Sequence, residues 1–366
     1  MDGDLVLPDY GGPCITNIVP ALLGPADELP GWMPTLLAEA DQVVLLVVDG
    51  LGWEQLRQRR ASTPTLATMV GGPITTVAPS TTAAALTSVT TGLPPGEHGL
   101  VGYRMVVHGE VLNVLRWATA TGDARQSLPP GKLQPVPPFL GQRPPVVTRA
   151  EYRSSGFTGA HLDPARYVGY RTLSTLVTEV DRRLRAAEPF VYAYYDGLDK
   201  VAHEYGLGEH YDAELTWVDH TVDRLLAVLP RRAALVVTAD HGQVDVGANL
   251  VEPARDVLAL CAMQSGEGRF RWLHARPGRA GALLEAAGAA HGDDAWVVAR
   301  DRMVAEGWLG PVVTDVAISR LGDVALVARR DVAFHDPHDT GPYHLVGRHG
   351  GLTSAEMYVP LLAASR

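Results

Sequence analysis

The sequence predicts an α/β fold in which a largely parallel sheet carries helices on both faces. Three short apolar runs indicate strands, at residues 42–48, 189–195 and 233–238. None of them alternates with polar residues, which is typical of strands covered on both faces. Apolar residues at helical spacing precede the second and third runs, at about 172–186 and 209–229. Strands that alternate with helices in this way favour a parallel sheet.

Two stretches interrupt the alternation. Residues 104–168 are rich in Pro, Gly and Arg and show little periodicity, so we predict a cap-like insertion. Residues 263–335 hold an Ala-rich helix pattern at 279–290, set between strand-like runs, and are predicted to form a small α+β subdomain. The core is then expected to comprise residues 1–103, 169–262 and 336–366.

Composition limits the class of function. The chain has 366 residues, of which 46% are hydrophobic and 20% charged, as in ordinary globular proteins. A formal net charge of −10 and the lack of any basic block argue against polymeric nucleic acid as a partner. A small anionic substrate remains compatible with this charge, because bound divalent cations would reverse the field inside a cleft.

The sequence also bears on location and cross-linking. Two cysteines, Cys14 and Cys261, are too few for a disulfide framework and lack the spacing of a metal site. The first residues have neither the basic nor the apolar region of a secretory signal, and the apolar runs are too short to cross a bilayer. We therefore expect a cytoplasmic protein without a membrane partner; no pattern indicates its oligomeric state.

Acidic residues follow all three predicted strands. They are Asp49, then Asp196 and Asp199, then Asp240. Ligands of open α/β sheets bind beyond the carboxyl ends of the strands, so these side chains are expected to meet there. Asp-Gly is also good turn chemistry, which would explain one such ending. Three endings, accompanied by His203 and His241, favour a site.

The spacing of these residues is typical of metal ligands. Asp199 and His203 are four residues apart, so both project from one face of a helix. Asp240 and His241 are adjacent and can share a cation only where the backbone turns, as it does at a strand end. A mixed set of carboxylates and imidazoles suits zinc, with manganese or iron as alternatives.

A candidate nucleophile precedes a predicted helix. The segment PSTTAAALTSVTTGLPPGEHGLVG covers residues 79–102 and brings Ser80, Thr81 and Thr82 to the start of that helix. Free backbone N–H groups at a helix start favour an anion. Ser and Thr also serve there as simple helix caps. A neighbouring metal cluster, which needs a group to activate, favours the catalytic interpretation without selecting one hydroxyl.

Five motifs in order resemble a known family. They are VVLLVVDG, the 79–102 segment, DGLDKVAHEYG, TADHG and GRHG. Together they resemble the type I phosphodiesterase/nucleotide pyrophosphatase branch of the alkaline phosphatase superfamily, over about 40–102, 189–245 and 345–364. The resemblance implies a three-layer α/β/α alkaline phosphatase-like core.

The resemblance also implies roles for single residues. One zinc ion would be held by Asp199, His203 and His349. The other would be held by Asp49, Asp240 and His241, with the oxygen of the nucleophile Thr82. Arg348-His349-Gly350 matches the family's C-terminal motif, which selects His349 over His335, His338 and His344. Lys200 and Arg348 flank ligands and are candidates for substrate binding, although both also fit ordinary surface charges.

The implied function is hydrolysis of a small anionic phosphate ester through a phosphothreonine intermediate, as a phosphodiesterase or nucleotide pyrophosphatase with two divalent metal ions. Ala85 stands where the resemblance leads us to expect an asparagine that steadies the phosphoryl group. This departure leaves a phosphomonoesterase, phosphonate hydrolase or phosphomutase as alternatives. An interaction module that binds metal without turnover is the alternative from another class.

Overall fold

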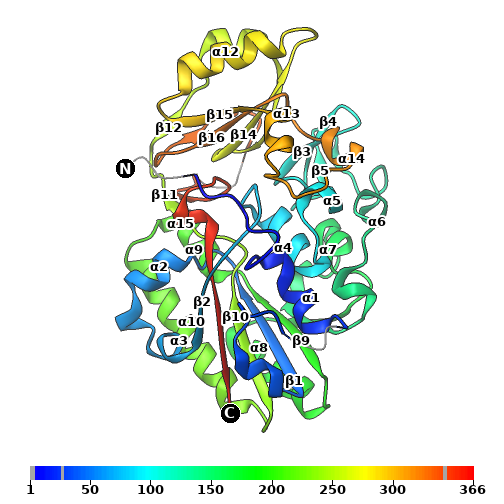
Figure 1. Cartoon of the computed structure of the whole chain (residues 1–366), viewed down its shortest axis with the longest axis vertical. Helices are drawn as coiled ribbons and strands as arrows, with labels where there is room; N and C mark the ends of the chain where they lie inside the picture. Colours follow the sequence, from blue (N-terminus) through cyan, green and yellow to red (C-terminus); the bar gives the residue numbers. More distant parts are fainter. Residues whose placement is uncertain (1–4, 26–28, 341–343) are drawn as a thin grey trace.

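A seven-stranded sheet forms the centre of the computed structural model, which describes residues 5–25, 29–340 and 344–366 (Figure 1). Its strands are, in spatial order, β2 (Val70–Thr75), β19 (Tyr358–Ser365), β10 (Ala233–Thr238), β1 (Gln42–Val48), β9 (Phe190–Tyr195), β7 (Pro145–Arg149) and β8 (Arg166–Tyr170). The five strands from β10 to β8 run parallel, and β19 runs antiparallel to both of its neighbours. The three strands predicted from apolar runs are β1, β9 and β10, and the predicted α/β fold is confirmed.

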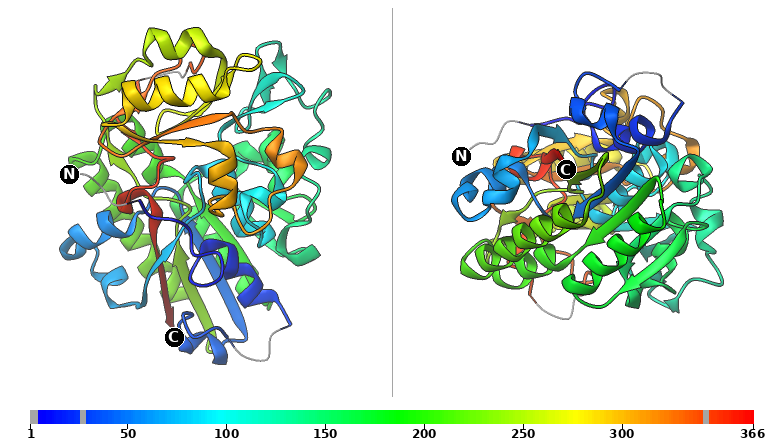
Figure 2. Two further views of the ribbon diagram at one scale, coloured as in Figure 1. Left: turned by 45° about the horizontal axis from the view of Figure 1, so that its top comes forward. Right: turned by 90° about the horizontal axis from the view of Figure 1, so that it is seen from below.

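Helices cover both faces of this sheet. The amphipathic helix α8 (Leu173–Arg185) packs beside α10 (Glu209–Val228) on one face. The opposite face is covered by α1 (Ile18–Leu23) and by α4 (Thr82–Thr91), as the view along the sheet shows (Figure 2). Because β1 is buried between these layers, its apolar run lacks polar alternation.

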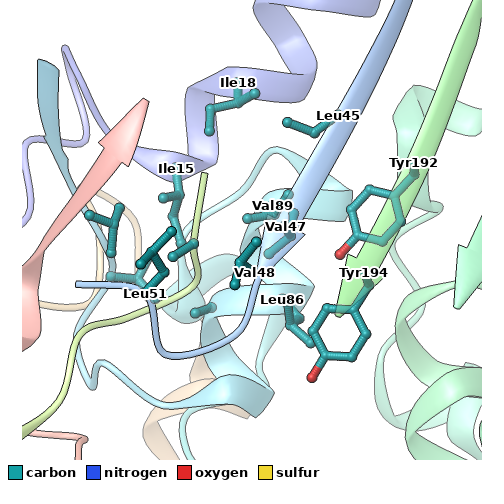
Figure 3. Packing of buried hydrophobic residues seen from close by; sticks show 14 of the residues in the cluster. Ile15, Ile18, Leu45, Val47, Val48, Leu51, Leu86, Val89, Tyr192 and Tyr194 are labelled. Carbon is teal, nitrogen blue, oxygen red and sulfur yellow. The ribbon is translucent and has the colours of Figure 1, made fainter. Parts of the chain in front are cut away.

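The packing around α4 fixes the position of its first turn. Ile15 and Ile18 pack with Leu86 and Val89 of α4 over Leu45 and Val47 of β1 and Tyr192 of β9 (Figure 3). Every residue of α4 is buried, and Gly92 ends the helix in the left-handed conformation. A helix enclosed in this way can hold a hydroxyl at its start in one place.

The structure corrects the extent of the predicted cap. Strands β7 and β8 lie inside residues 104–168, yet they extend the central sheet. Their short runs, PVVTR and RYVGY, are flanked by Pro and Gly, which hid them in a segment without periodicity. The rest of the segment forms a small antiparallel sheet, β3 (Arg104–Val107), β4 (Glu110–Asn113), β5 (Ala118–Thr119) and β6 (Gly122–Asp123), followed by the helices α6 (Pro130–Leu133) and α7 (Gly156–His161).

A second sheet with its own apolar core lies beyond the carboxyl ends of the central strands (Figures 1 and 2). Its antiparallel strands are, in order, β13 (Cys261–Glu267), β14 (Phe270–Ala275), β16 (Val324–Ala328) and β15 (Ala295–Ala299), with α12 (Ala280–His291) packed on them. Two further short strand pairs are β11 (Val244–Asp245) with β18 (Gly347–Arg348) and β12 (Leu250–Val251) with β17 (Ala333–Phe334), and the second pair joins the core to this subdomain.

Shorter helices complete the chain. They are α2 (Trp53–Gln58), α3 (Pro64–Thr68), α5 (Pro95–His98), α9 (Gly197–Tyr205), α11 (Arg255–Leu260), α13 (Arg300–Ala305), α14 (Asp315–Ile318) and α15 (Ser354–Met357). Within the described residues, no helix combines the length and the apolar character needed to span a membrane.

Candidate metal centre and active-site cleft

The acidic residues predicted at the strand ends converge at one edge of the sheet. Asp49 follows β1 and Asp240 follows β10, the neighbour of β1. Helix α9 begins directly after β9, the other neighbour, and carries Asp199 and His203 in successive turns. The parallel order of these three strands therefore brings ligands from three distant segments together.

Asp49, Asp240 and His241 form the buried half of this centre. The Nε2 atom of His241 lies 3.2 Å from Asp49 Oδ1 and 3.4 Å from Asp240 Oδ2. These two carboxylate oxygens are buried and have no hydrogen-bond partner among the described residues. The other oxygens are held in place, Asp49 Oδ2 by the hydroxyl of Tyr194 and Asp240 Oδ1 by the backbone N–H of Gly50 at 3.2 Å. The unpartnered oxygens thus face a common point beside His241 Nε2.

Thr82 is the first residue of α4 and lies next to the buried half. Its hydroxyl is 3.1 Å from His241 Nε2. Thr81, the alternative left open by the residue pattern, is the N-cap residue and lines the same cleft. Of the three candidate hydroxyls, those of Ser80, Thr81 and Thr82, only that of Thr82 has a hydrogen bond to a predicted metal ligand among the described residues. The third candidate, Ser80, instead donates its hydroxyl to the carbonyl of Gly351, at 2.7 Å.

Asp199, His203 and His349 form the open half. Asp199 Oδ1 lies 3.4 Å from His203 Nε2 and 3.8 Å from His349 Nε2. One set of possible ligand atoms here joins Asp199 and His349 with His241, all within 4.8 Å of one another. The ring of His349 stacks on that of His241, with centroids 3.4 Å apart. His203 is therefore adjacent to this set through Asp199.

Hydrogen bonds to the second ring nitrogens orient both outer histidines. His203 Nδ1 lies 2.7 Å from the carbonyl of Gly347, and His349 Nδ1 lies 2.9 Å from that of Ser80. Each Nε2 atom is left to face Asp199. The side-chain amide of Gln243 donates to Asp199 Oδ1. A backbone carbonyl behind a ligating histidine is the usual arrangement in metal sites.

The electrostatics of the centre fit cations. Burial, followed by repulsion from Asp49, raises the pKa of both Asp199 and Asp240 well above the usual range. Burial opposes a charge on His241, but the Asp240 and Asp49 carboxylates raise the pKa of its imidazole to about 10. Burial lowers the pKa of His203 to about 4. Crowded carboxylates, two of them with an unpartnered oxygen, beside three histidine rings match a site for two divalent cations.

The two predicted substrate contacts have different surroundings. Lys200 lines the cleft, but its ammonium group pairs with Asp196 at 2.6 Å and contacts the hydroxyl of Tyr152 at 2.9 Å. Arg348 also lines the cleft. Its Nε atom is buried without a partner, and the described residues form no ion pair with its guanidinium group. Of the two, Arg348 is the more available to an anion.

Position 85 does not face the cleft. Thr81, Thr82 and Leu86 line it, whereas Ala85 is fully buried within the core. An asparagine at this position of α4 would therefore point away from the reacting groups, and its absence does not remove a phosphoryl contact.

The cleft extends from the metal centre between core, cap and subdomain, with a volume of about 480 Å³. Phe157, His161 and Leu162 of the cap form an apolar wall with Leu86 and Tyr192. The subdomain contributes Glu267 and Gly268 at the tip of the β13–β14 hairpin. Burial raises the pKa of Glu267 to about 8.

The residue pattern did not indicate Glu267, Tyr194 or Gln243. Glu267 is the last residue of strand β13 in a segment without any motif, and its only local signal is the turn sequence GEGR.

Comparisons with known proteins give a matching family model and similar solved structures. The model of the type I phosphodiesterase/nucleotide pyrophosphatase family matches residues 43–352. Murine ectonucleotide pyrophosphatase/phosphodiesterase 5 has a similar fold, with a TM-score of 0.68 and 17% identity over 89% of this chain and 88% of that one. A structure of its inactive threonine-to-alanine variant in complex with AMP is also similar, with a TM-score of 0.68 and 16% identity over the same shares.

A phosphonate-cleaving protein has the same fold as well. Phosphonoacetate hydrolase from Sinorhizobium meliloti, in complex with phosphonoformate, gives a TM-score of 0.64 and 18% identity over 88% of this chain and 90% of that one. No curated protein matches the sequence.

Proposed function

The chain belongs to the type I phosphodiesterase/nucleotide pyrophosphatase family, and from this premise we propose that it hydrolyses phosphodiesters or nucleotide pyrophosphates with two divalent cations and the nucleophile Thr82. Zinc is the cation that best suits the mixed carboxylate and imidazole donors. The substrate is a small anionic phosphate ester.

The position of Thr82 carries this proposal. Its hydroxyl starts helix α4 and lies 3.1 Å from His241, beside the unpartnered oxygens of Asp49 and Asp240. A phosphoryl group that reaches Thr82 therefore also reaches both halves of the centre. The start of a helix adds a favourable field for the negative charge that develops on the threonine oxygen.

The reaction proceeds as two displacements at phosphorus. Thr82 Oγ1 attacks, a P–O bond to Thr82 forms, and the bond from phosphorus to the leaving alcohol breaks. Thr82 gives up its hydroxyl proton and the alcohol takes up a proton. Water then attacks the phosphothreonine, the P–O bond to Thr82 breaks, and Oγ1 regains a proton. When bound, the cations lower the pKa of the attacking hydroxyl and stabilise charge on the leaving oxygen.

Arg348 is the side chain best suited to bind a phosphoryl oxygen. It lines the cleft next to the ligand His349 and pairs with no carboxylate of the described residues. Lys200 instead neutralises the buried Asp196, together with Arg149. We therefore assign the anion contact to Arg348 and a role in holding the cleft wall to Lys200.

Cleavage of a phosphonate is the second candidate, because phosphonoacetate hydrolase shares the fold. The AMP complex of the murine relative supports the first candidate, hydrolysis of phosphate esters. The extended apolar wall around Phe157 and Tyr192 favours a substrate with a sizeable organic group over a compact phosphonate.

A substrate panel on the zinc-loaded protein tests the proposal. We expect kcat/KM for bis(para-nitrophenyl) phosphate to exceed that for para-nitrophenyl phosphate and for phosphonoacetate by about tenfold or more. A preference for the monoester or for phosphonoacetate would contradict the diesterase assignment in favour of the corresponding alternative.

A further inference from the structure

Glu267 is an acidic residue inside a cleft that is proposed to bind anions. It is 8% exposed and ends strand β13 at the hairpin tip that reaches the cleft. Its Oε2 atom accepts a hydrogen bond of 3.3 Å from the backbone N–H of Tyr103, and its Oε1 atom has no partner among the described residues. Leaving a buried carboxyl oxygen without a hydrogen bond is costly, so this residue requires an explanation.

The hairpin tip is fixed in place. Arg269, next but one to Glu267, is fully buried and forms a bidentate ion pair with Glu356, with N···O distances of 2.9 and 2.7 Å. Arg269 also donates to the carbonyl of Val332 at 2.8 Å. Glu356 in turn accepts the backbone N–H of Gly351 at 2.8 Å, which ties the tip to the segment that follows His349. Glu267 is thus held rigidly with respect to the metal centre.

Glu267 lies directly against that segment. A Cβ atom added to Gly350 would be 2.6 Å from Glu267 Cγ and 2.9 Å from its Oε1. Gly350 has a φ of +117° and follows the ligand His349, so a glycine is required at this contact. Glu267 also lines the same cleft as Thr82 and the metal ligands, so an organic group attached to a phosphorus atom at the metal centre can extend along the cleft to the Glu267 carboxyl.

The chemistry of Glu267 restricts what it can bind. Phosphoryl oxygens are acceptors and carry negative charge, so they belong with the cations and with Arg348. A carboxyl oxygen requires a donor. Among the charged neighbours of Glu267, Arg271 lowers its pKa and Asp339 raises it, so the surrounding charges do not call for a further cation at this place. A neutral hydroxyl remains, and it can donate to an ionised carboxylate or accept from a protonated one.

We propose that Glu267 is a specificity-determining residue that hydrogen-bonds a hydroxyl of the organic group on phosphorus, so that the preferred substrates are phosphodiesters of a polyol or sugar. The inference rests on the proposed function and names the substrate class of that site. In the alternative role, Glu267 only accepts the backbone N–H of Tyr103 and does not contact the substrate. That role predicts that kcat/KM does not depend on substrate hydroxyls.

Three matched esters test the inference on the zinc-loaded protein: para-nitrophenyl glyceryl phosphate, para-nitrophenyl propyl phosphate and para-nitrophenyl aminopropyl phosphate. We expect kcat/KM for the glyceryl ester to exceed that for the propyl ester by about tenfold or more. Equal values would overturn the inference without any variant. A preference for the aminopropyl ester would also overturn it, because Glu267 would then bind an ammonium group and not a hydroxyl.

Variants then assign the preference to one side chain. Glu267→Leu is expected to reduce the glyceryl-to-propyl ratio to within about twofold, whatever its effect on the individual rates, and Glu267→Gln to restore part of it. Glu285→Gln, on the exposed face of α12, is the control and should keep the wild-type ratio. A wild-type ratio in Glu267→Leu would exclude the proposed contact.

A binding measurement separates this inference from the proposed function. Calorimetry on zinc-loaded Thr82→Ala protein should give tighter binding of the glyceryl ester than of the propyl ester, and the difference should disappear when Glu267→Leu is added. If the wild-type enzyme hydrolyses neither ester, the proposed function fails, and this binding difference alone decides the role of Glu267. Equal binding of the two esters refutes that role even if both are hydrolysed.

Discussion

The two halves of the metal centre differ in burial and in donor type. In the half formed by Asp49, Asp240 and His241, the side chains are 3%, 0% and 0% exposed. In the half formed by Asp199, His203 and His349, they are 12%, 17% and 9% exposed. The buried half has two carboxylates and one imidazole, and the open half has the reverse. The buried half therefore concentrates more negative charge in surroundings with less access to water.

This difference implies a division of roles. Unpartnered buried carboxylate oxygens make the buried half costly without a cation, so we expect it to bind its metal more tightly. The open half, whose histidines face the cleft, is where ligands and solvent can exchange. Thr82 lies on the buried side, so in the proposed mechanism the cation of the buried half would activate it.

Asp240→Asn should have the largest effect of the ligand substitutions. It removes a charge from the buried half while preserving shape, and we expect kcat to fall about a thousandfold or more together with loss of one bound metal ion per chain. Steady-state kinetics and elemental analysis of the same sample check both effects. Full metal content with unchanged turnover would show that Asp240 is not a ligand.

His203→Gln should have a smaller effect. Asp199 and His349 remain in the open half, and with His241 they still form a set of possible ligand atoms within 4.8 Å of one another. We expect a loss of kcat of about a hundredfold, restored in part by excess zinc, whereas Asp240→Asn should not respond to it. Titration with zinc measures the difference. Equal responses of the two variants would abolish the distinction between a tight and an exchangeable site.

Tyr194→Phe should weaken the buried half without removing a ligand. The phenol donates to Asp49 Oδ2 and so orients that carboxylate. Loss of such a supporting bond lowers metal affinity by about tenfold or somewhat more. Competition with a chromogenic chelator measures this, with Tyr205→Phe, a half-exposed tyrosine of α9, as the control. If both variants retain wild-type affinity, Tyr194 does not position Asp49.

The smallest expected effect is that of His161→Gln, outside the metal centre, on the free energy of unfolding. Burial lowers the pKa of His161 to about 4, well below its unfolded value near 6.5. The stability that the neutral ring contributes is therefore fully present above pH 6.5 and is lost as the pH falls toward 4. In chelated protein, His161→Gln should reduce the slope of unfolding free energy against pH in this window by up to about 1.4 kcal/mol per pH unit.

Denaturant unfolding at a series of pH values checks that prediction. His210→Gln, a substitution of an exposed ring, provides the control and should leave the slope unchanged. Equal slopes for wild type and His161→Gln would mean that His161 is not held neutral by the fold.

The residues at the strand ends were predictable because the apolar runs and residue spacings that locate them lie within short segments of the sequence. Apolar runs locate β1, β9 and β10, and parallel strands must bring Asp49, Asp199 and Asp240 to one edge. Four-residue spacing on α9 places His203 beside Asp199. The choices of His349 and Thr82 required the family resemblance, since other histidines and hydroxyls occupy equivalent local patterns. Their ligand and nucleophile roles, like the cytoplasmic location, stay predictions.

The cleft walls could not be predicted in the same way. Glu267 reaches the centre only because Arg269 ties a distant hairpin to Glu356, a pairing across 87 positions of the chain. Strands β7 and β8 lie in a Pro-rich segment whose short runs carry no periodic signal, and only the pairing of β7 with β9 and of β8 with β7 reveals them. Such contacts depend on how separate segments dock, which no local pattern encodes.

Thr82→Ala tests the central claim most directly when activity and metal content are measured on one sample. The claim is that the Thr82 oxygen attacks phosphorus beside two bound cations. It predicts that hydrolysis of bis(para-nitrophenyl) phosphate falls to the background rate while two zinc ions per chain remain bound. Near-normal hydrolysis by this variant with both metal ions in place would contradict it.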